Sequence, residues 1–207
     1  MSAPVADKFG EYIGVSDVYI AEVTEDSKSA YTVGTPEYLA PVANVLMEPS
    51  VAVKTRHYDN KAYYSTATEG ETKVSVDVSG LPLATSARIL GKHYDATAKR
   101  LYDSGDASKA PHFALGFKTD VEGGEKYFWF LKGKFSPFKE EAATRTNDID
   151  EKPTALEYTA LVTVHDTFKV DGKASPCKRV VADTREDETL TSTTWFASVQ
   201  KPAEMSA

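Results

Sequence analysis

The stretch FALGFKTDVEGGEKYFWFLKGKF, residues 113–135, decides the fold of this chain. Its first part places Phe113, Leu115 and Phe117 at alternate positions, which is the two-residue period of a β-strand. The sequence EGGE at 122–125 is a turn signal, and a second apolar run follows it to the end of the stretch. The pattern therefore predicts a β-hairpin.

The second strand of this hairpin is apolar on both faces. Tyr127, Trp129 and Leu131 share one face, and Phe128 and Phe130 share the other. A strand of this kind has to be covered on both sides. We expect the core of the chain to cover one face, and a neighbouring subunit is a candidate cover for the other.

Similar apolar periodicity predicts the other elements. Alternation predicts strands around Val18 and Ile20, within 42–53 with a break near Pro49, at 74–78, and from Leu156 to Val164. Leu83, Ala87 and Leu90 instead have helical spacing, with Pro82 in the first turn and Gly91 just past the end. We therefore expect one helix at about 82–90 and a second, short one near 195–199.

The segments between these elements set the expected domain organisation. Residues 54–71 and 136–152 are long and polar, and we predict that both are loops. We expect a single domain, with an N-terminal arm at 1–14, a β core at 15–170 and a C-terminal extension at 171–207. The expected fold class is mainly β, with one flanking α-helix, long loops and extended termini.

Composition argues against several classes of function. The net charge of −7 over 207 residues disfavours a nucleic-acid binder or a protein of anionic membrane surfaces. Cys177 is the only cysteine, so no disulfide forms within the chain and assembly in the cytosol is expected. Neither a secretory signal pattern nor an apolar run of about 18 residues is present.

No pattern of residues indicates catalysis or a bound cofactor. The sequence has no glycine-rich nucleotide-binding motif. His57, His93, His112 and His165 lack the spacing of metal ligands, and we interpret them as ordinary surface or loop residues. Cys177 lacks the sequence context of a nucleophile. We therefore expect that the protein is not an enzyme.

Several segments, taken in order, resemble the phage major tail proteins of the phi13 type. They are VSDVYIAEVTED at 15–26, EYLAPVANVLMEPS at 37–50, VSVDVSGLPLATSARILGKHYD at 74–95, ALGF at 114–117, YFWFLKGKFS at 127–136, TRTNDIDEKPTALEYTA at 144–160, DTREDE at 183–188 and TWFASVQKP at 194–202. Their order and spacing extend over nearly the whole chain.

The resemblance implies a structural role in the tail of a long-tailed bacteriophage. It implies a tail-tube-type β-sandwich or barrel, in hexameric rings that stack into a hollow, non-contractile tube for the ejection of double-stranded DNA. It also implies assembly in the cytoplasm of the host and a final location in the virion tail. The implied partners are further copies of the chain, a tape measure protein, a tail-tip initiator and a tail terminator, with no cofactor.

Ring stacking needs protrusions that reach the next ring. We predict that these are the two long loops and the N-terminal arm, and that the acidic charge of the chain keeps DNA from adhering to the lumen. The candidate interface residues are Arg56, His57, Tyr58, Asp59, Tyr63, Tyr64, Phe138, Arg145, Asp148 and Asp150.

Three other interpretations are open on the residues alone. A tail terminator or connector would share the fold but stop at one ring. A carbohydrate-binding β-sandwich would use its tyrosines and tryptophans on glycans and would be monomeric. An enzyme would need scattered histidines and aspartates to converge in one pocket.

Overall fold

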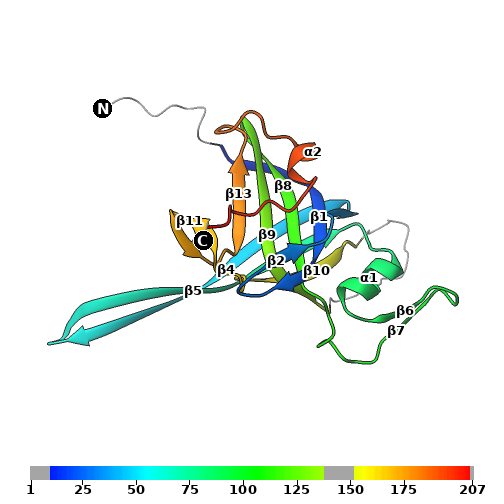
Figure 1. Ribbon diagram of the computed structural model, residues 1–207, viewed down its shortest axis with the longest axis horizontal. Coiled ribbons are helices and arrows are strands. Elements are labelled where there is room, and N and C mark those ends of the chain that lie inside the picture. The colour runs from blue at the N-terminus through cyan, green and yellow to red at the C-terminus, as the bar shows by residue number, and fades with distance from the viewer. Residues whose placement is uncertain (1–9, 138–151, 206–207) are drawn as a thin grey trace, which may run out of the picture.

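The computed structural model describes residues 10–137 and 152–205. A large antiparallel sheet forms the body, with strand order β2-β1-β8-β9-β10-β5-β4; β3 also pairs with β1, and β13 with β9 (Figure 1). The strands of this sheet are β1 Tyr12–Asp26, β2 Tyr31–Val33, β3 Glu37–Ala40, β4 Val42–Tyr58, β5 Lys61–Val78, β8 Phe113–Val121, β9 Gly124–Ser136, β10 Thr154–Leu161 and β13 Arg179–Asp183.

Four short strands form two small ribbons beside the main sheet. They are β6 His93–Asp95 with β7 Arg100–Tyr102, and β11 Phe168–Val170 with β12 Lys173–Ser175. The mainly β class is therefore confirmed. Among the described strands the sheet does not close into a barrel, because β1 and β4 do not pair with each other.

The predicted hairpin is present and lies at the centre of the sheet. β8 pairs with β9 from Val121 and Gly124 to Phe113 and Gly133. The other edge of β9 is shared, since β13 pairs with its first half and β10 with its second half. Gly116 is required by close packing, because a Cβ there would lie 2.8 Å from the indole ring of Trp129.

One face of β9 lies in the main core, as the alternation predicts. Phe128 and Phe130 are buried there, and the ring of Phe117 stacks on that of Phe128 at 4.9 Å between centroids. Tyr158 of β10 is also buried, and its hydroxyl donates a hydrogen bond to the carbonyl of Phe113 at 2.8 Å. This core joins strands from both ends of the sheet.

The other face of β9 is covered by the chain itself, which corrects the idea of a neighbouring subunit there. Tyr127 and Trp129 pack in a second core with Phe168, Trp195 and Phe196, all of which are buried. These partners lie far along the chain, so the local sequence of the hairpin did not reveal them.

The segment 171–207 is correspondingly not a projecting extension over its described part. Its strand β13 lies in the main sheet, and the residues after β13 cross the second face of β9 (Figure 1). The predicted helix at 82–90 is confirmed as α1, Leu83–Ile89. The second helix, α2, spans Ser192–Trp195 and begins before 195 because Thr191 caps it with a capping box.

Candidate subunit interface

Residues 54–71 form a projecting hairpin, which corrects the prediction of a loop. β4 and β5 continue beyond the body as a paired ribbon, from Val51 opposite Glu69 to Tyr58 opposite Lys61. We call residues 51–69 the arm. Figure 1 shows it reaching well clear of the rest of the molecule.

The local sequence explains why the arm is a hairpin. Asp59 and Asn60 form its turn with φ values of 49° and 60°, as a two-residue type I′ turn requires. The flanking residues are rich in Thr, Val and Tyr, which favour strands. The alternation of apolar and polar residues is weak because neither face of the arm is buried.

Large apolar side chains of the arm are exposed to solvent. Val51, Val53, Tyr58, Tyr63 and Tyr64 are between 52% and 69% exposed. Between Thr72 and the tip, the ribbon pairs with no third strand among the described residues. A two-stranded hairpin without a covered face is marginally stable in water, so the arm gains little stability from its own contacts.

The tip of the arm carries a cluster of three tyrosines. Tyr63 is the extra residue of a β-bulge, since Arg56 pairs with Tyr64 while His57 pairs with Ala62. The bulge brings the ring centroid of Tyr63 to 4.9 Å from that of Tyr64 and 6.1 Å from that of Tyr58. The three rings pack edge to face, a favoured aromatic geometry.

One face of the arm combines these rings with positive charge. A shallow depression of about 410 Å³ is lined by Lys54, Arg56, Tyr58, Tyr64 and Thr66. Neither cation is in an ion pair with any residue that the structure describes. The depression therefore has free charge and exposed aromatic surface in the same place.

The root of the arm is fixed to the body by Lys178. Its ammonium group forms an ion pair with Glu69 and donates to the carbonyl of Gly70 at 3.0 Å and the hydroxyl of Thr72 at 3.1 Å. The hydrogen bond from Lys178 lowers the pKa of the Glu69 carboxyl. These contacts fix the base of the arm to the main sheet.

The structure brings six of the predicted interface residues together at the tip. These are Arg56, His57, Tyr58, Asp59, Tyr63 and Tyr64. The other four, Phe138, Arg145, Asp148 and Asp150, lie outside the described residues, as does most of the predicted loop 136–152. Sequence reasoning missed Lys54 and Thr66 as members of the depression, because the spacing that joins them to Tyr64 exists only in a paired strand.

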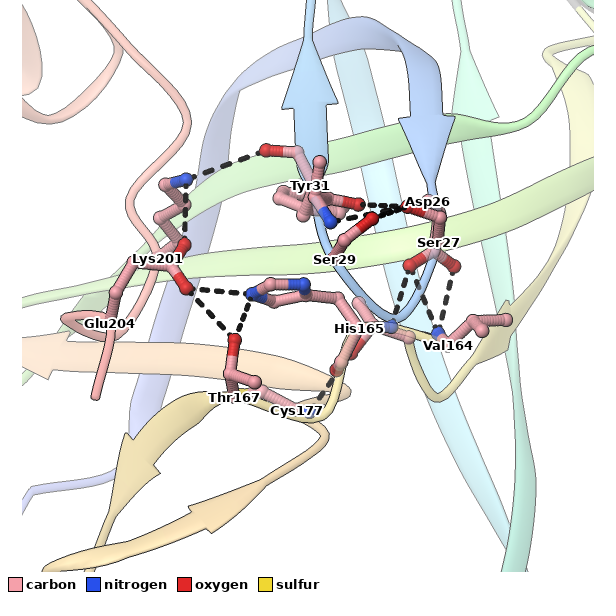
Figure 2. A network of polar contacts seen from close by, with 12 residues as sticks. Asp26, Ser27, Ser29, Tyr31, Val164, His165, Thr167, Cys177, Lys201 and Glu204 are labelled. Carbon is pink, nitrogen blue, oxygen red and sulfur yellow. Dashed lines mark hydrogen bonds and ion pairs between the residues drawn. The ribbon is translucent and has the colours of Figure 1, made fainter. Parts of the chain in front are cut away.

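A second polar site lies where the β10–β11 connection meets β1 (Figure 2). The carboxylate of Asp26 accepts hydrogen bonds from the backbone N–H groups of Val164 and His165 at 2.9–3.0 Å, and Lys132 donates to it at 2.5 Å. Burial alone would raise the pKa of Asp26, but Lys132 and the two N–H groups outweigh burial and lower it. Asp26 therefore holds the connection in place.

His165 lies in a loop, as expected, but its side chain is buried and so is not a surface residue. Its Nε2 lies 2.7 Å from a carboxylate oxygen of Glu204 and 2.9 Å from the hydroxyl of Thr167 (Figure 2). A catalytic relay would place the acid and the hydroxyl on opposite ring nitrogens. Here both contact the same nitrogen, so the arrangement ties the C-terminal segment to β11 without forming a relay.

Cys177 has no geometry that would activate its thiol. Burial raises its pKa, and its Sγ donates to the carbonyl of Arg179 at 3.4 Å. Lys178, one of the two cationic residues that follow Cys177, is engaged at the root of the arm.

Within 10–137 and 152–205, no group of three or more His, Cys, Asp or Glu side chains is arranged to hold a metal ion. Over the same described part of the chain, neither helix has the length and apolar character needed to cross a bilayer. Comparison with protein-family models gives no match, and a search of curated proteins gives no significant match.

Proposed function

We propose that this protein is a structural subunit that assembles with copies of itself, as the major tail protein of a long-tailed bacteriophage. The observation that carries the proposal is the arm, a two-stranded ribbon with both faces and both edges exposed. Exposed edges and apolar faces are normally protected in proteins that act as monomers. A neighbouring subunit would supply the missing cover.

The body of the protein suits a subunit that keeps its shape while it assembles. Its two cores are completed by the chain's own residues, and Lys178 anchors the arm to the sheet. An arm at one end that binds a different surface on the next copy gives a heterologous contact. Such contacts produce rings where the rotation between copies closes and open filaments where it does not. The resemblance to the tail proteins favours stacked hexameric rings.

The acidic character of the chain fits passage of DNA through such a tube. A net charge of −7 per subunit repels phosphates and keeps a duplex from adhering to the wall. The tape measure protein, initiator and terminator follow from the same proposal, as does a location in the virion tail.

Negative-stain electron microscopy of the concentrated full-length chain tests this proposal. Hollow tubes with a regular axial repeat would support it. Isolated rings that do not stack would favour a tail terminator or connector. A monomer that binds glycans on its exposed tyrosines would favour the carbohydrate-binding interpretation and contradict a tube subunit.

A further inference from the structure

The partner of the arm can be identified by its chemistry. Residues 54–64 contain Lys54, Arg56 and Lys61 against Asp59, a net charge of +2 in a chain whose total is −7. The remainder of the chain therefore carries −9. A basic, aromatic tip on an acidic protein favours an anionic partner, with cations that attract carboxylates and rings that pack against their aliphatic stems.

An acidic surface lies at one end of the body. The segment 183–188 packs on the β8–β9 turn, where the N–H of Thr184 donates to the carbonyl of Glu125 at 3.0 Å. The N–H of Glu122 in that turn donates to the carbonyl of Glu11 at 3.1 Å, so the start of β1 adjoins it. We call this surface the acidic end; its acids are Glu11, Asp120, Glu122, Glu125, Asp183, Glu186, Asp187 and Glu188.

Cations of the body neutralise only part of this surface. Lys118 forms ion pairs with Asp120 and Glu125, and Arg185 pairs with Asp183 at 2.6 Å. The exposed carboxylates of Glu122, Glu186 and Glu188 form no ion pair with any described residue. The acidic end thus keeps free negative charge for a partner.

A single chain cannot bring its own arm to this surface. β5 enters the body at Thr72, which pairs with Ala160, and Ala160 pairs with Gly133 of β9. The acidic turn lies at the other end of β9, at Gly124, nine residues or about 30 Å away. From its root the arm extends a further ~26 Å outward, and Figure 1 shows it pointing away from the top of β13.

We propose that the basic face of the arm, with Lys54 and Arg56, binds the free carboxylates of Glu186 and Glu188 on the acidic end of a second copy of this chain. This inference rests on the proposed function, because it names the surface that receives the arm. The two patches lie on different parts of the molecule, so the contact is head to tail and can repeat indefinitely.

Charge reversal and charge exchange test the pairing. Lys54→Glu/Arg56→Glu reverses the arm, Glu186→Lys/Glu188→Lys reverses the acidic end, and a fourfold variant combines them. Lys28→Glu/Arg100→Glu is the matched control, since both residues are exposed and neither forms an ion pair with a described residue. The critical concentration for assembly is measured by sedimentation and electron microscopy, at low and high ionic strength.

We expect each reversed variant to raise the critical concentration at least about tenfold, with the fourfold variant and the control near the wild type. We also expect high salt to weaken wild-type assembly. If the arm-reversed variant assembles like the wild type, or if the fourfold variant does not recover, the pairing is wrong while the proposed function stands. If the wild-type chain never assembles, the proposed function itself is contradicted.

Duplex DNA is the other anionic ligand to consider for the basic face of the arm, and a DNA-binding assay distinguishes it from a second copy of the chain. Binding of DNA that is lost in the arm-reversed variant, with assembly unchanged, would identify nucleic acid as the ligand of the arm and overturn the inference. Absence of DNA binding together with recovery in the fourfold variant supports it.

Discussion

The β8–β9 hairpin and the arm are both antiparallel ribbons, but they lie in opposite environments. Phe130 of β9 is fully buried, whereas Tyr63 of the arm is 69% exposed. β9 is paired along both edges and covered on both faces by the chain itself. Beyond its root, the arm is neither paired along its outer edges nor covered on its faces by any residue that the structure describes. From this difference we expect stability to be concentrated in the body and the arm to contribute little to folding.

Removing the C-terminal cover of β9 should have the largest effect. A chain ending at residue 190 lacks Trp195, Phe196 and Val199 of the second core. Loss of one buried Trp or Phe side chain costs about 3–5 kcal/mol, and whole domains are stable by only about 5–15 kcal/mol. We expect this chain to lose cooperative unfolding in urea, followed by circular dichroism.

The matched deletion removes the arm instead. Residues 53–67 are replaced by Asn-Gly, which joins the paired residues Ala52 and Thr68 through a type I′ turn. We expect the body to keep a cooperative transition. A chain that unfolds without its arm would show that the arm is part of the folding unit.

A single substitution in each hairpin sharpens the contrast. Phe130→Ala should lower the free energy of unfolding by about 3–5 kcal/mol, because it leaves a cavity in the main core. Val53→Ala in the arm should change it by less than about 0.5 kcal/mol. Urea denaturation at concentrations below assembly measures both, and similar losses for the two variants would contradict the account.

Asp26 gives a pH-dependent contribution to the body. Its pKa is lowered in the folded state, so its contribution is present above the unfolded pKa of about 4 and is lost as the pH falls through the lower folded-state value. Asp26→Asn should cost about 1–3 kcal/mol at neutral pH, because it leaves Lys132 without a charged partner. The difference from the wild type should shrink in urea titrations below about pH 4. A constant difference would mean that the carboxylate charge is not what matters.

The smallest effect on stability is expected at the arm tip. Tyr63→Ser/Tyr64→Ser should leave the unfolding free energy within about 0.5 kcal/mol of the wild type, since both rings are exposed. The same variant should lose tube formation in electron micrographs. Tyr102→Ser is the control, because Tyr102 is also exposed but lies in β7, away from the arm. Tubes formed equally by both variants would remove the tyrosine cluster from the interface.

The sequence predicted the parts of the fold that alternate or repeat locally. The β8–β9 hairpin and the helix near Leu83 follow from short-range spacing. The residues that cover Trp129 could not be predicted in this way. Phe168 and Phe196 lie about 40 and 70 residues further along the chain, and only the folded sheet brings them together with Trp129.

The candidate interface was predicted by residue but not by conformation. The tyrosines near Asp59 were identified, but their segment was expected to be a loop, since a ribbon exposed on both faces shows little apolar alternation. The strand signal was the Thr and Tyr content with an Asp-Asn turn. Lys54 and Thr66 could be placed beside Tyr64 only once the strand register was known.

We propose that another copy of the chain covers the arm. Amide hydrogen exchange measured by mass spectrometry, on dilute and on assembled protein, tests it most directly. We expect peptides from 51–69 to exchange quickly in the dilute protein and to become protected on assembly, while β9 is protected in both states. Protection of 51–69 already in the dilute monomer, or rapid exchange there in the assembled protein, would contradict it.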